Sequence, residues 1–463
     1  MTTVDAPNED ELRLTTWIEQ HIEGTVATLT RDSRWRPSWT AQVDHGSTRR
    51  TLHIRGDRGH GYSYPVSYEA AILGVLEANG IPVPHVHGLC EAPVAIVMDH
   101  IAGTGQLSGI EDPEIRRSVI DQYVEILVAI HAIDVTEFER VGVRNPADPV
   151  DLQMSFHRDR RRIYREQLKS RPDPFIEFVE LWLDRNVPRH RTARSFVTFD
   201  AGQFLVQDGR IGALYDFEIS HINDPLADLA GLRVRNTFEP LGDLGYLLSA
   251  YERRTGEALD LDVINFHTVV LAIASNQAIA RLLTQPLPDA INWRIWEVSG
   301  SRIAISAIAD ALGSRLEPVE PASSAPGRPT LATSAMAAAV DAISATDDGS
   351  YQQRMASNLA RHLALVEQYG DAVESLNLDD AAILLGHRPD STVQADELLE
   401  RFVREAGPEY DVDLLALFHR RTERKRQLLP EFDPATAPAG DVGPYLDHCH
   451  LAPLAAVLAD GTQ

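Results

Sequence analysis

The stretch Phe196-Val-Thr-Phe-Asp200-Ala-Gly-Gln203-Phe-Leu-Val206 decides the fold. Its two ends have the period-two apolar pattern of strands, and a turn at Gln207-Asp208-Gly209 follows before a second apolar run. This pattern predicts a β-hairpin, whereas the segments on both sides of it have helical spacing. The chain therefore places a short hairpin with polar loop residues among helices.

Acidic and amide side chains flank the two strands of this predicted hairpin. Asp200 and Gln203 lie in the loop before the first strand, and Asp216 and Glu218 follow the second strand. Loops at one edge of a rigid hairpin bring such side chains together. Their oxygens are the ligands that Mg²⁺ prefers, while the ion keeps several waters. The segment therefore suits a hard cation such as Mg²⁺.

Outward from the hairpin, the chain divides into a sheet-forming part and a helical part. Residues 12–22 have amphipathic helical spacing, and three alternating, β-branched runs between residues 25 and 55 predict a small antiparallel sheet. From Asp112 onward helical spacing dominates. These patterns predict an α+β fold in four segments: an N-terminal lobe over 1–102, a C-terminal lobe over 103–316, a Pro-, Ala- and Ser-rich linker over 317–333, and a helical domain over 334–463.

Composition and charge exclude several classes of protein. The 463 residues are 44% apolar, which is enough for two or three domains with buried cores. Lys and Arg number 43 against 68 Asp and Glu, and the formal net charge of −25 opposes broad attraction to nucleic acid or to an anionic membrane. Cys90 and Cys449 are too few for a disulfide framework, and no run reaches the roughly 18 apolar residues of a membrane span. We therefore expect a cytoplasmic protein without nucleic-acid or membrane partners.

The segments around the hairpin resemble the aminoglycoside phosphotransferase and choline kinase-like family, small-molecule kinases with a protein-kinase-like fold. The family pattern is His-Gly-Asp, four residues and Asn, followed later by Asp, an aromatic residue and an acid, and then by Gly-Asp-Pro and Asp-Leu-Ala. This chain has at these places Thr198-Phe-Asp200, Gln203, Asp216-Phe-Glu218, Asp224-Pro and Asp228-Leu-Ala. The resemblance covers about residues 25 to 310. It implies a two-lobed fold with a small antiparallel-sheet N-lobe and a mostly helical C-lobe.

The resemblance implies a role for each of these residues. Asp200 would orient an acceptor hydroxyl and take its proton. Gln203 would be the amide ligand of Mg²⁺, and Asp216 its principal carboxylate ligand. Asp224 and Asp228 would brace the catalytic loop.

Upstream segments imply a nucleotide site by the same resemblance. Arg55, near the end of a predicted strand, would grip the phosphates of ATP or GTP, and Glu69, in the next helix, would pair with it. Met98, Asp99 and His100 lie in the segment that resembles the hinge between the lobes, and they would line the nucleotide site.

The catalytic loop departs from the family pattern and leaves an alternative open. Phe199 stands where Gly is usual, Thr198 stands where His is usual, and two residues fewer separate Asp200 from Gln203. We favour Asp200 as the catalytic residue, because the side chain of Gln203 is one methylene longer than Asn and compensates in part for the shorter loop. A register anchored on the downstream strand would instead place Thr198 there, and the loop would then have no catalytic carboxylate.

Two further departures affect the nucleotide site. Arg55 stands where the family has Lys, which keeps the charge but presents a planar fork. The nucleotide-covering loop over 32–39 contains no glycine, which limits close backbone approach to phosphates. Two hypotheses follow. The first is a Mg²⁺-dependent phosphotransferase that acts on a hydroxyl group of a small molecule; the alternative is a pseudokinase-like protein that binds a nucleotide or another ligand without phosphoryl transfer.

Three other features complete the predictions. The basic run from His157 to Arg171 would hold an anionic ligand, or it would be a solvated helix face with internal ion pairs. His131 is expected to be a hydrogen-bonded structural residue rather than a base. In a third hypothesis, the helices beyond residue 334 form a partner-binding or dimerisation module, which would make the protein a homodimer.

Overall fold

The computed structural model describes residues 8–32, 36–57, 64–105, 107–323, 336, 340, 350–431 and 446–461. The chain forms two compact units, each of which combines several stretches of sequence. The first unit consists of residues 1–147, 192–228 and 247–257, and the second consists of residues 148–191, 229–246 and 258–463. These two units are not the same divisions of the chain as the four segments predicted from the sequence. The boundaries of those segments stay a prediction. The predicted linker lies outside the described residues beyond residue 323.

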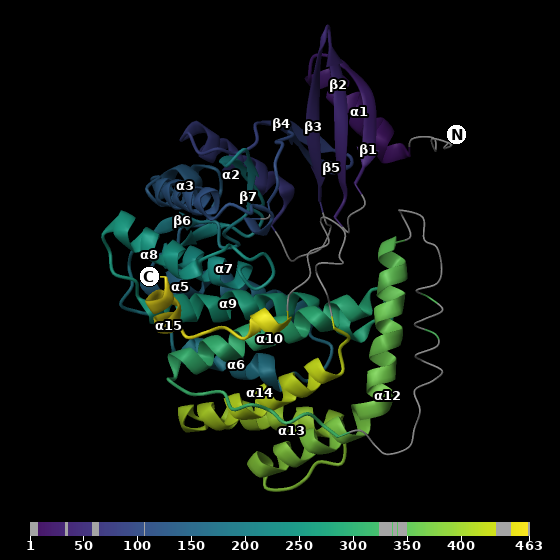
Figure 1. The fold of residues 1–463 in the computed structure, drawn as a ribbon, viewed down its shortest axis with the longest axis vertical. Coiled ribbons are helices and arrows are strands. Elements are labelled where there is room, and N and C mark those ends of the chain that lie inside the picture. Colours follow the sequence, from purple (N-terminus) through teal and green to yellow (C-terminus); the bar gives the residue numbers. More distant parts are fainter. Residues whose placement is uncertain are drawn as a thin grey trace. The chain divides into compact units, whose positions relative to one another are not determined.

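The first unit contains a five-stranded antiparallel sheet in the order β1-β2-β3-β5-β4 (Figure 1). Its strands are β1 (Thr25–Arg31), β2 (Ser38–His45), β3 (Thr48–Gly56), β4 (Val86–Glu91) and β5 (Val94–Asp99). Helix α1 (Glu9–His21) contacts β1 and β4, and its Leu14 and Ile18 join strand side chains in one buried core. A capping box between Asn8 and Glu11 begins this helix by satisfying backbone N–H groups that have no partner inside it. The predicted antiparallel sheet is confirmed.

Helix α2 (Val66–Ala78) packs against β4 and β5. Its buried residues are apolar except for Glu69. Strand β3 runs antiparallel to β5, and Arg55 pairs with Ile96 across the two strands. Arg55 is the second-last residue of β3. The first unit therefore contains one acid on a helix and one base at a strand end, both in elements that contact β5.

The remainder of the first unit holds helices and two small sheets. Helix α3 (Pro113–His131) begins after the N-cap residue Asp112, with a proline in its first turn, and α4 (Val135–Arg140) follows it. Strand β6 (Ser195–Val197) pairs with β9 (His221–Asn223), and β7 (Phe204–Gln207) pairs with β8 (Arg210–Leu214). The predicted hairpin is therefore present as β7 and β8. Its turn contains Asp208 and Gly209, both at positive φ.

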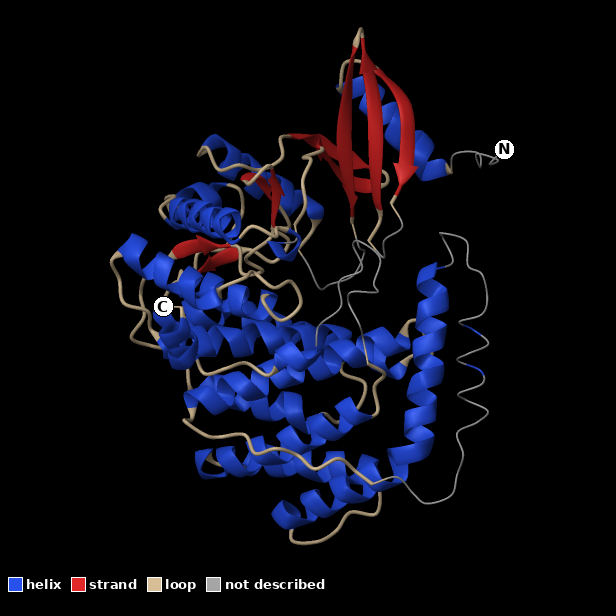
Figure 2. Ribbon diagram, in the orientation of Figure 1, coloured by secondary structure: helices blue, strands red, loops and turns tan. Residues whose placement is uncertain are grey.

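The second unit is built of helices (Figures 1 and 2). They are α5 (Pro149–Ile163), continued by a π-helical turn (Tyr164–Leu168), α6 (Pro174–Arg185), α9 (Leu261–Ile279), α10 (Ala290–Ala311), α12 (Ser350–Leu385), α13 (Thr392–Glu405), α14 (Asp411–Gln427) and α15 (Leu454–Asp460). Helices α7 (Leu226–Arg235) and α8 (Leu244–Thr255) contain residues of both units, and short 3-10 turns cover Leu107–Gly109, Leu282–Thr284, Pro408–Tyr410 and Leu446–Cys449.

The C-terminal helices pack onto earlier helices of the second unit. Helix α9 lies beside α10, while α12 and α14 pack on α10 and α13 packs on α6. The fold class is thus confirmed as α+β, with a small antiparallel sheet, a mostly helical part and an additional helical region at the C-terminus. The dimerisation role of these helices stays a prediction. In the stretches that the structure describes, no helix is both long enough and apolar enough to cross a membrane.

The basic run over residues 157–171 is paired with acids of its own unit. Arg161 lies 2.6 Å from Asp184, Arg165 lies 3.1 Å from Glu177 and also contacts Glu180, and Lys169 lies 2.8 Å from Glu400. Because Glu400 belongs to α13, the run also ties a C-terminal helix to the rest of the unit. These contacts support the interpretation as an ion-paired helix face.

Candidate active site

One buried carboxylate, that of Asp228 in α7, holds the loop that follows β6. Its Oδ2 accepts the N–H of Thr198 at 3.1 Å, and its Oδ1 accepts the hydroxyl of Thr198 at 2.9 Å and the N–H of Phe199 at 2.6 Å. His131, at the end of α3, lies 2.9 Å from Oδ2 through Nε2, and its Nδ1 lies 2.9 Å from the hydroxyl of Tyr251. The structure therefore confirms that Asp228 braces this loop and that His131 is hydrogen-bonded, as predicted.

Phe199 has a left-handed backbone conformation, with φ of 64°, where the family pattern has Gly. Such a conformation costs a non-glycine residue about 1 to 3 kcal/mol and persists when the surrounding structure holds it. Phe199 is completely buried, and its ring packs edge-on against His221 with the centroids 5.1 Å apart. Burial of such a side chain contributes about 1.5 to 3 kcal/mol, so it offsets the strain of the backbone. The loop therefore has a conformation suited to glycine without containing one at this position.

The same brace separates the two candidates for the catalytic position. Thr198 is buried, and its hydroxyl donates to Asp228. Asp200 is partly exposed, and its carboxylate Oδ2 accepts a hydrogen bond from Nε2 of Gln203 at 3.0 Å. The N–H of Asp200 donates to the carbonyl of Thr198 at 2.8 Å, which closes a tight turn between the two residues. The geometry thus makes Thr198 part of the scaffold and leaves the side chain of Asp200 partly exposed. The catalytic role of Asp200 stays a prediction.

The hairpin connects Gln203 to the segment that carries Asp216. The N–H of Tyr215 donates to the carbonyl of Gln203 at 3.2 Å, which extends the pairing of β7 with β8 by one residue. Asp216 follows directly, again with a left-handed backbone, at φ of 67°. Strained non-glycine residues collect at functional sites that their surroundings keep in place. Two such residues, Phe199 and Asp216, therefore mark the two loops that the sequence singled out.

Arg55 lies among three carboxylates. Its Nε lies 3.0 Å from Oε2 of Glu69, and its Nη2 contacts Asp216 and lies 3.3 Å from Oε2 of Glu218. Glu69 also accepts the backbone N–H of Phe217 at 3.1 Å through its Oε1, which connects α2 to the Asp216 segment. The predicted ion pair between Arg55 and Glu69 is present, and two acids from the loop after β8 extend it.

A second guanidinium completes this group, and the sequence analysis did not identify it. Arg36, in the loop between β1 and β2, is buried; its Nη1 lies 2.5 Å from Oε2 of Glu218, and its Nε donates to the carbonyl of Gly56 at 3.1 Å. The signal in the sequence was an arginine inside a nucleotide-covering loop without glycine. We call the five side chains together, Arg36, Arg55, Glu69, Asp216 and Glu218, the Arg55 cluster.

The charges of the Arg55 cluster keep Arg55 protonated. Burial opposes the charged form of its guanidinium, but the carboxylates of Asp216, Glu69 and Glu218 raise its pKa above the ordinary value for arginine. The five named side chains comprise two guanidiniums and three carboxylates, so their formal charges leave one negative charge in excess. A site of this composition favours a further cation.

The three residues predicted to line the nucleotide site lie at the end of β5. Met98 is buried in the sheet. The carboxylate of Asp99 lies 2.9 Å from Nε2 of His87, and the N–H of His100, an exposed residue, donates to the carbonyl of Thr51 at 3.2 Å. These contacts hold the end of the strand in place. The nucleotide contacts of Met98, Asp99 and His100 stay a prediction.

The donors near the hairpin fit Mg²⁺ in one particular way. Among the described residues, no group of three or more His, Cys, Asp or Glu side chains is arranged to hold a metal ion. Mg²⁺ in phosphate-transferring enzymes is usually bound by one or two carboxylates, with phosphates and waters completing the coordination. Asp216 offers a carboxylate and Gln203 an amide oxygen, which are donors of that kind. The residues therefore fit a Mg²⁺ ion bound together with phosphates, rather than one caged by protein alone.

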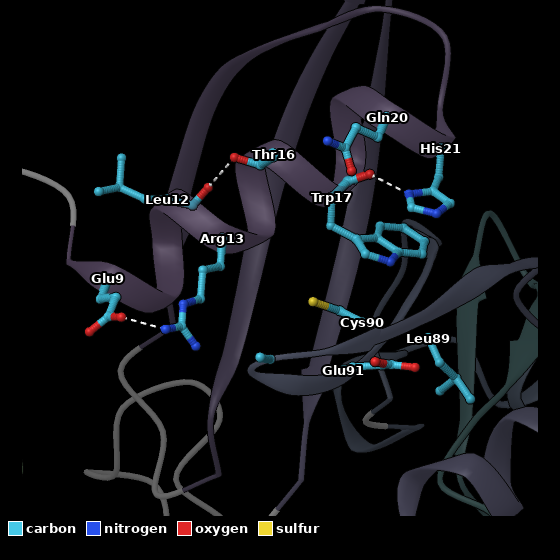
Figure 3. A pocket seen from close by; sticks show the side chains of 11 residues that line it. Glu9, Leu12, Arg13, Thr16, Trp17, Gln20, His21, Leu89, Cys90 and Glu91 are labelled. Carbon is cyan, nitrogen blue, oxygen red and sulfur yellow. Dashed lines mark hydrogen bonds and ion pairs between the residues drawn. The ribbon is translucent and has the colours of Figure 1, made fainter.

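A separate groove of about 590 Å³ lies between α1 and β4 (Figure 3). The rings of Trp17 and His21 stack on its α1 side, and Leu89, Cys90 and Glu91 line its β4 side. Gly88 of β4 has φ of 154°, and a side chain there would meet the ring of Trp17 at 3.0 Å, so a glycine is required for this close approach. The lining includes none of the residues that the sequence analysis assigned to a site.

A family model describes the part of the chain that carries this site. Residues 40–264 match the model of the phosphotransferase enzyme family. The matched range contains Arg55, Glu69, Asp200, Gln203 and Asp216, and it ends before α10 and the C-terminal helices. The match confirms the resemblance inferred from the hairpin and its loops. A search of curated protein sequences found no match.

Solved structures of small-molecule phosphotransferases are similar to the chain at low identity. The choline kinase LicA from Streptococcus pneumoniae is 16% identical, with a TM-score of 0.49 over 65% of this chain and 99% of that one. The macrolide 2′-phosphotransferase MphH from Brachybacterium faecium is 17% identical, with a TM-score of 0.41 over 67% and 100% of the two chains. An aminoglycoside-3′-phosphotransferase of type VIII is 18% identical, with a TM-score of 0.44 over 58% and 100%.

Proposed function

We propose that this protein is a phosphotransferase that moves the terminal phosphoryl group of ATP or GTP to a hydroxyl group of a small molecule, with Mg²⁺ as cofactor. The loop braced by Asp228 carries this proposal, because it buries Thr198 and leaves the carboxylate of Asp200 partly exposed and hydrogen-bonded to Gln203. The family match over residues 40–264 supports the same class of reaction.

Phosphoryl transfer needs little covalent chemistry from the protein and depends on positioning and electrostatics. Asp200 takes the proton of the acceptor hydroxyl, while Gln203 fixes the orientation of its carboxylate. Arg55 binds the phosphates of the nucleotide, and Glu69 holds the guanidinium from the other side. Asp216 and Gln203 would hold Mg²⁺, which neutralises phosphate charge when it is bound. No covalent intermediate on the enzyme is required.

A second candidate function is that of a pseudokinase-like binding protein. The observation that favours it is the contact between Arg55 and Asp216, which pairs the phosphate-binding residue with the metal-binding one. A nucleotide loop without glycine points in the same direction. Such a protein would bind a nucleotide or another ligand and would transfer no phosphoryl group.

The substitution Asp200→Asn tests the proposed function. We expect it to keep Mg²⁺-dependent nucleotide binding and to lower turnover by roughly two to four orders of magnitude, the usual contribution of a positioned base. Calorimetry measures the binding, and release of the nucleoside diphosphate measures turnover, first with water as acceptor and then with a panel of hydroxyl compounds.

Asp208→Asn is the matched control, because Asp208 is exposed in the turn of the same hairpin and Asn also tolerates its positive φ. Turnover by Asp200→Asn equal to that of this control would contradict the role of Asp200. Nucleotide binding by the unsubstituted protein without turnover on any acceptor would favour the pseudokinase-like function.

A further inference from the structure

Within the Arg55 cluster, Arg55 contacts Asp216, although the proposed function gives these two residues different partners. Arg55 would bind phosphate and Asp216 would bind Mg²⁺, yet in this structure the guanidinium of Arg55 contacts the carboxylate of Asp216 directly. A guanidinium in contact with this carboxylate opposes the binding of a metal cation to the same group, because the two positive charges repel each other. The inference that follows rests on the proposed function and concerns how the site passes from one set of partners to the other.

Asp216 and Glu218 differ in how firmly they are held. Oε2 of Glu218 lies 2.5 Å from Nη1 of Arg36 and 3.3 Å from Nη2 of Arg55, so two guanidiniums share one oxygen. The side chain of Glu218 is 9% exposed, whereas that of Asp216 is 19% exposed. Arg36 is itself anchored by its hydrogen bond to the carbonyl of Gly56. Glu218 therefore keeps a partner if Arg55 moves, and Asp216 is the carboxylate better placed to take a new cation.

We propose that Arg55 is the resident cation at Asp216 in the nucleotide-free protein, and that loading of a metal–nucleotide complex is an exchange. In this exchange Arg55 leaves Asp216 for the phosphates, Asp216 accepts the metal ion, and Arg36 keeps Glu218 paired. Arg55 and Asp216 each give up one partner of opposite charge for another, so neither of these two charges is left unpaired in the buried site.

The shape of arginine explains how the exchange works without loss of the Glu69 pair. A guanidinium presents donors along separate edges of a planar fork, so Nε stays near Glu69 while Nη2 changes partner. An ammonium group carries all its donors on one atom, so it cannot keep one edge near Glu69 while another edge changes partner. The replacement of the family lysine by Arg55 thus has a function in this site.

The exchange predicts opposite changes in two affinities. Without the charge of Arg55, Asp216 loses a competing cation, so a metal ion alone should bind more tightly. The nucleotide loses a phosphate-binding group, so the nucleotide should bind more weakly. A merely structural role of Arg55 would weaken both, because the whole cluster would become disordered.

The experiment measures Mn²⁺ binding without nucleotide, from the electron paramagnetic resonance signal of the free ion, and then nucleotide binding with Mg²⁺ by calorimetry. For Arg55→Gln we expect Mn²⁺ affinity to rise by about tenfold or more and nucleotide affinity to fall by a similar factor. Arg49→Gln is the matched control, because Arg49 lies on the same strand β3, is exposed, and pairs with Asp44 at 2.6 Å. We expect this control to change neither affinity.

Each outcome decides between the exchange and the proposed function. Mn²⁺ affinity of Arg55→Gln equal to or below that of the unsubstituted protein overturns the exchange, even when nucleotide binding is weakened as the proposed function requires. Tighter Mn²⁺ binding with unchanged nucleotide affinity overturns the phosphate contact of Arg55 and, with it, the second half of the exchange.

If circular dichroism shows that Arg55→Gln is unfolded, Arg55→Lys decides. This variant keeps a positive charge for Glu69 but lacks the second, separate nitrogen with which Arg55 contacts Asp216. We expect it to bind Mn²⁺ several-fold more tightly than the unsubstituted protein, and equal or weaker binding overturns the proposal.

Discussion

The Asp228 brace and the Arg55 cluster are two buried charged networks in the same unit, and their charges are satisfied in different ways. Asp228 accepts hydrogen bonds from two backbone N–H groups and a hydroxyl of the loop that it holds, and it contacts the ring of His131. The Arg55 cluster is held by contacts between full charges, which come from a strand, a helix and two loops. Donors that belong to the braced loop cannot leave without unfolding it, whereas charged partners can be exchanged for ions or phosphates. The first network therefore fixes geometry, and the second suits ligand exchange.

The largest expected effect comes from breaking the fixed network. Asp228→Asn replaces a carboxylate oxygen by an amide NH₂ that faces donors such as the N–H of Thr198 or Phe199. Hydrogen bonds to a buried charged group contribute about 1.5 to 3 kcal/mol each, so we expect the free energy of unfolding to fall by about 2 to 4 kcal/mol. Urea unfolding followed by circular dichroism measures this change.

Asp208→Asn again serves as the control, because it is the same Asp-to-Asn substitution at an exposed turn residue outside the network. A loss for Asp228→Asn no larger than that of the control would show that the loop does not depend on its brace.

The fixed network was more predictable from the sequence than the exchangeable one. The period-two pattern around Phe204 and the turn at Gly209 are local signals, and they predicted the hairpin. The brace by Asp228 was implied by the resemblance of its motif to the family pattern. The pair between Arg55 and Glu69 was also expected, because the resemblance to the family implied it.

The rest of the Arg55 cluster depends on contacts over long sequence separations. Arg36 meets Glu218 across 182 positions, and Arg55 meets Asp216 across 161 positions. No periodicity reports such contacts, because they result from the packing of loops rather than from any local pattern. The same reason explains why the pairing of Lys169 with Glu400 could not be foreseen.

His157 is a third kind of buried ionisable side chain, one without an acidic partner in the part of the chain that the structure describes, and it should make the stability of the protein depend on pH. We expect this effect to be intermediate in size. His157 in α5 is fully buried, and neither ring nitrogen has a hydrogen-bond partner among the described residues. Burial, with smaller contributions from Arg161, Arg158 and Arg165, lowers its pKa to about 3. Because the ordinary pKa of about 6.5 applies to the unfolded chain, the stability contribution of neutral His157 is complete above pH 6.5 and is lost as the pH falls toward 3.

We therefore expect the free energy of unfolding to drop by about 2 to 3 kcal/mol more between pH 7 and pH 4.5 in the unsubstituted protein than in His157→Leu. Urea unfolding at the two pH values measures the difference. His387→Leu, at an exposed turn of the same unit, is the control and should keep the full pH dependence. Equal pH dependence in all three proteins would mean that the imidazole of His157 is solvated or paired in the native state.

The smallest expected effect concerns Gln203 in the loop after β6. The proposed function gives this side chain two roles, to orient the carboxylate of Asp200 and to bind Mg²⁺. Its Nε2 donates to Oδ2 of Asp200 at 3.0 Å. In Gln203→Asn the side chain is one methylene shorter, and in a loop already two residues short it no longer reaches that carboxylate. Loss of one partly exposed hydrogen bond is worth about 1 kcal/mol, so we expect turnover to fall about five- to tenfold. Gln207→Asn, at the exposed end of β7, is the matched control.

The double variant Asp200→Asn/Gln203→Asn then separates the two roles of Gln203. If Gln203 acts by orienting Asp200, the second substitution removes a contact that no longer matters, and the double variant has the turnover of Asp200→Asn alone. If the two losses multiply instead, Gln203 acts independently of Asp200, as a ligand of the metal ion would. The braced loop would then position Asp200 without the amide, and Gln203 would belong to the exchangeable network with Asp216.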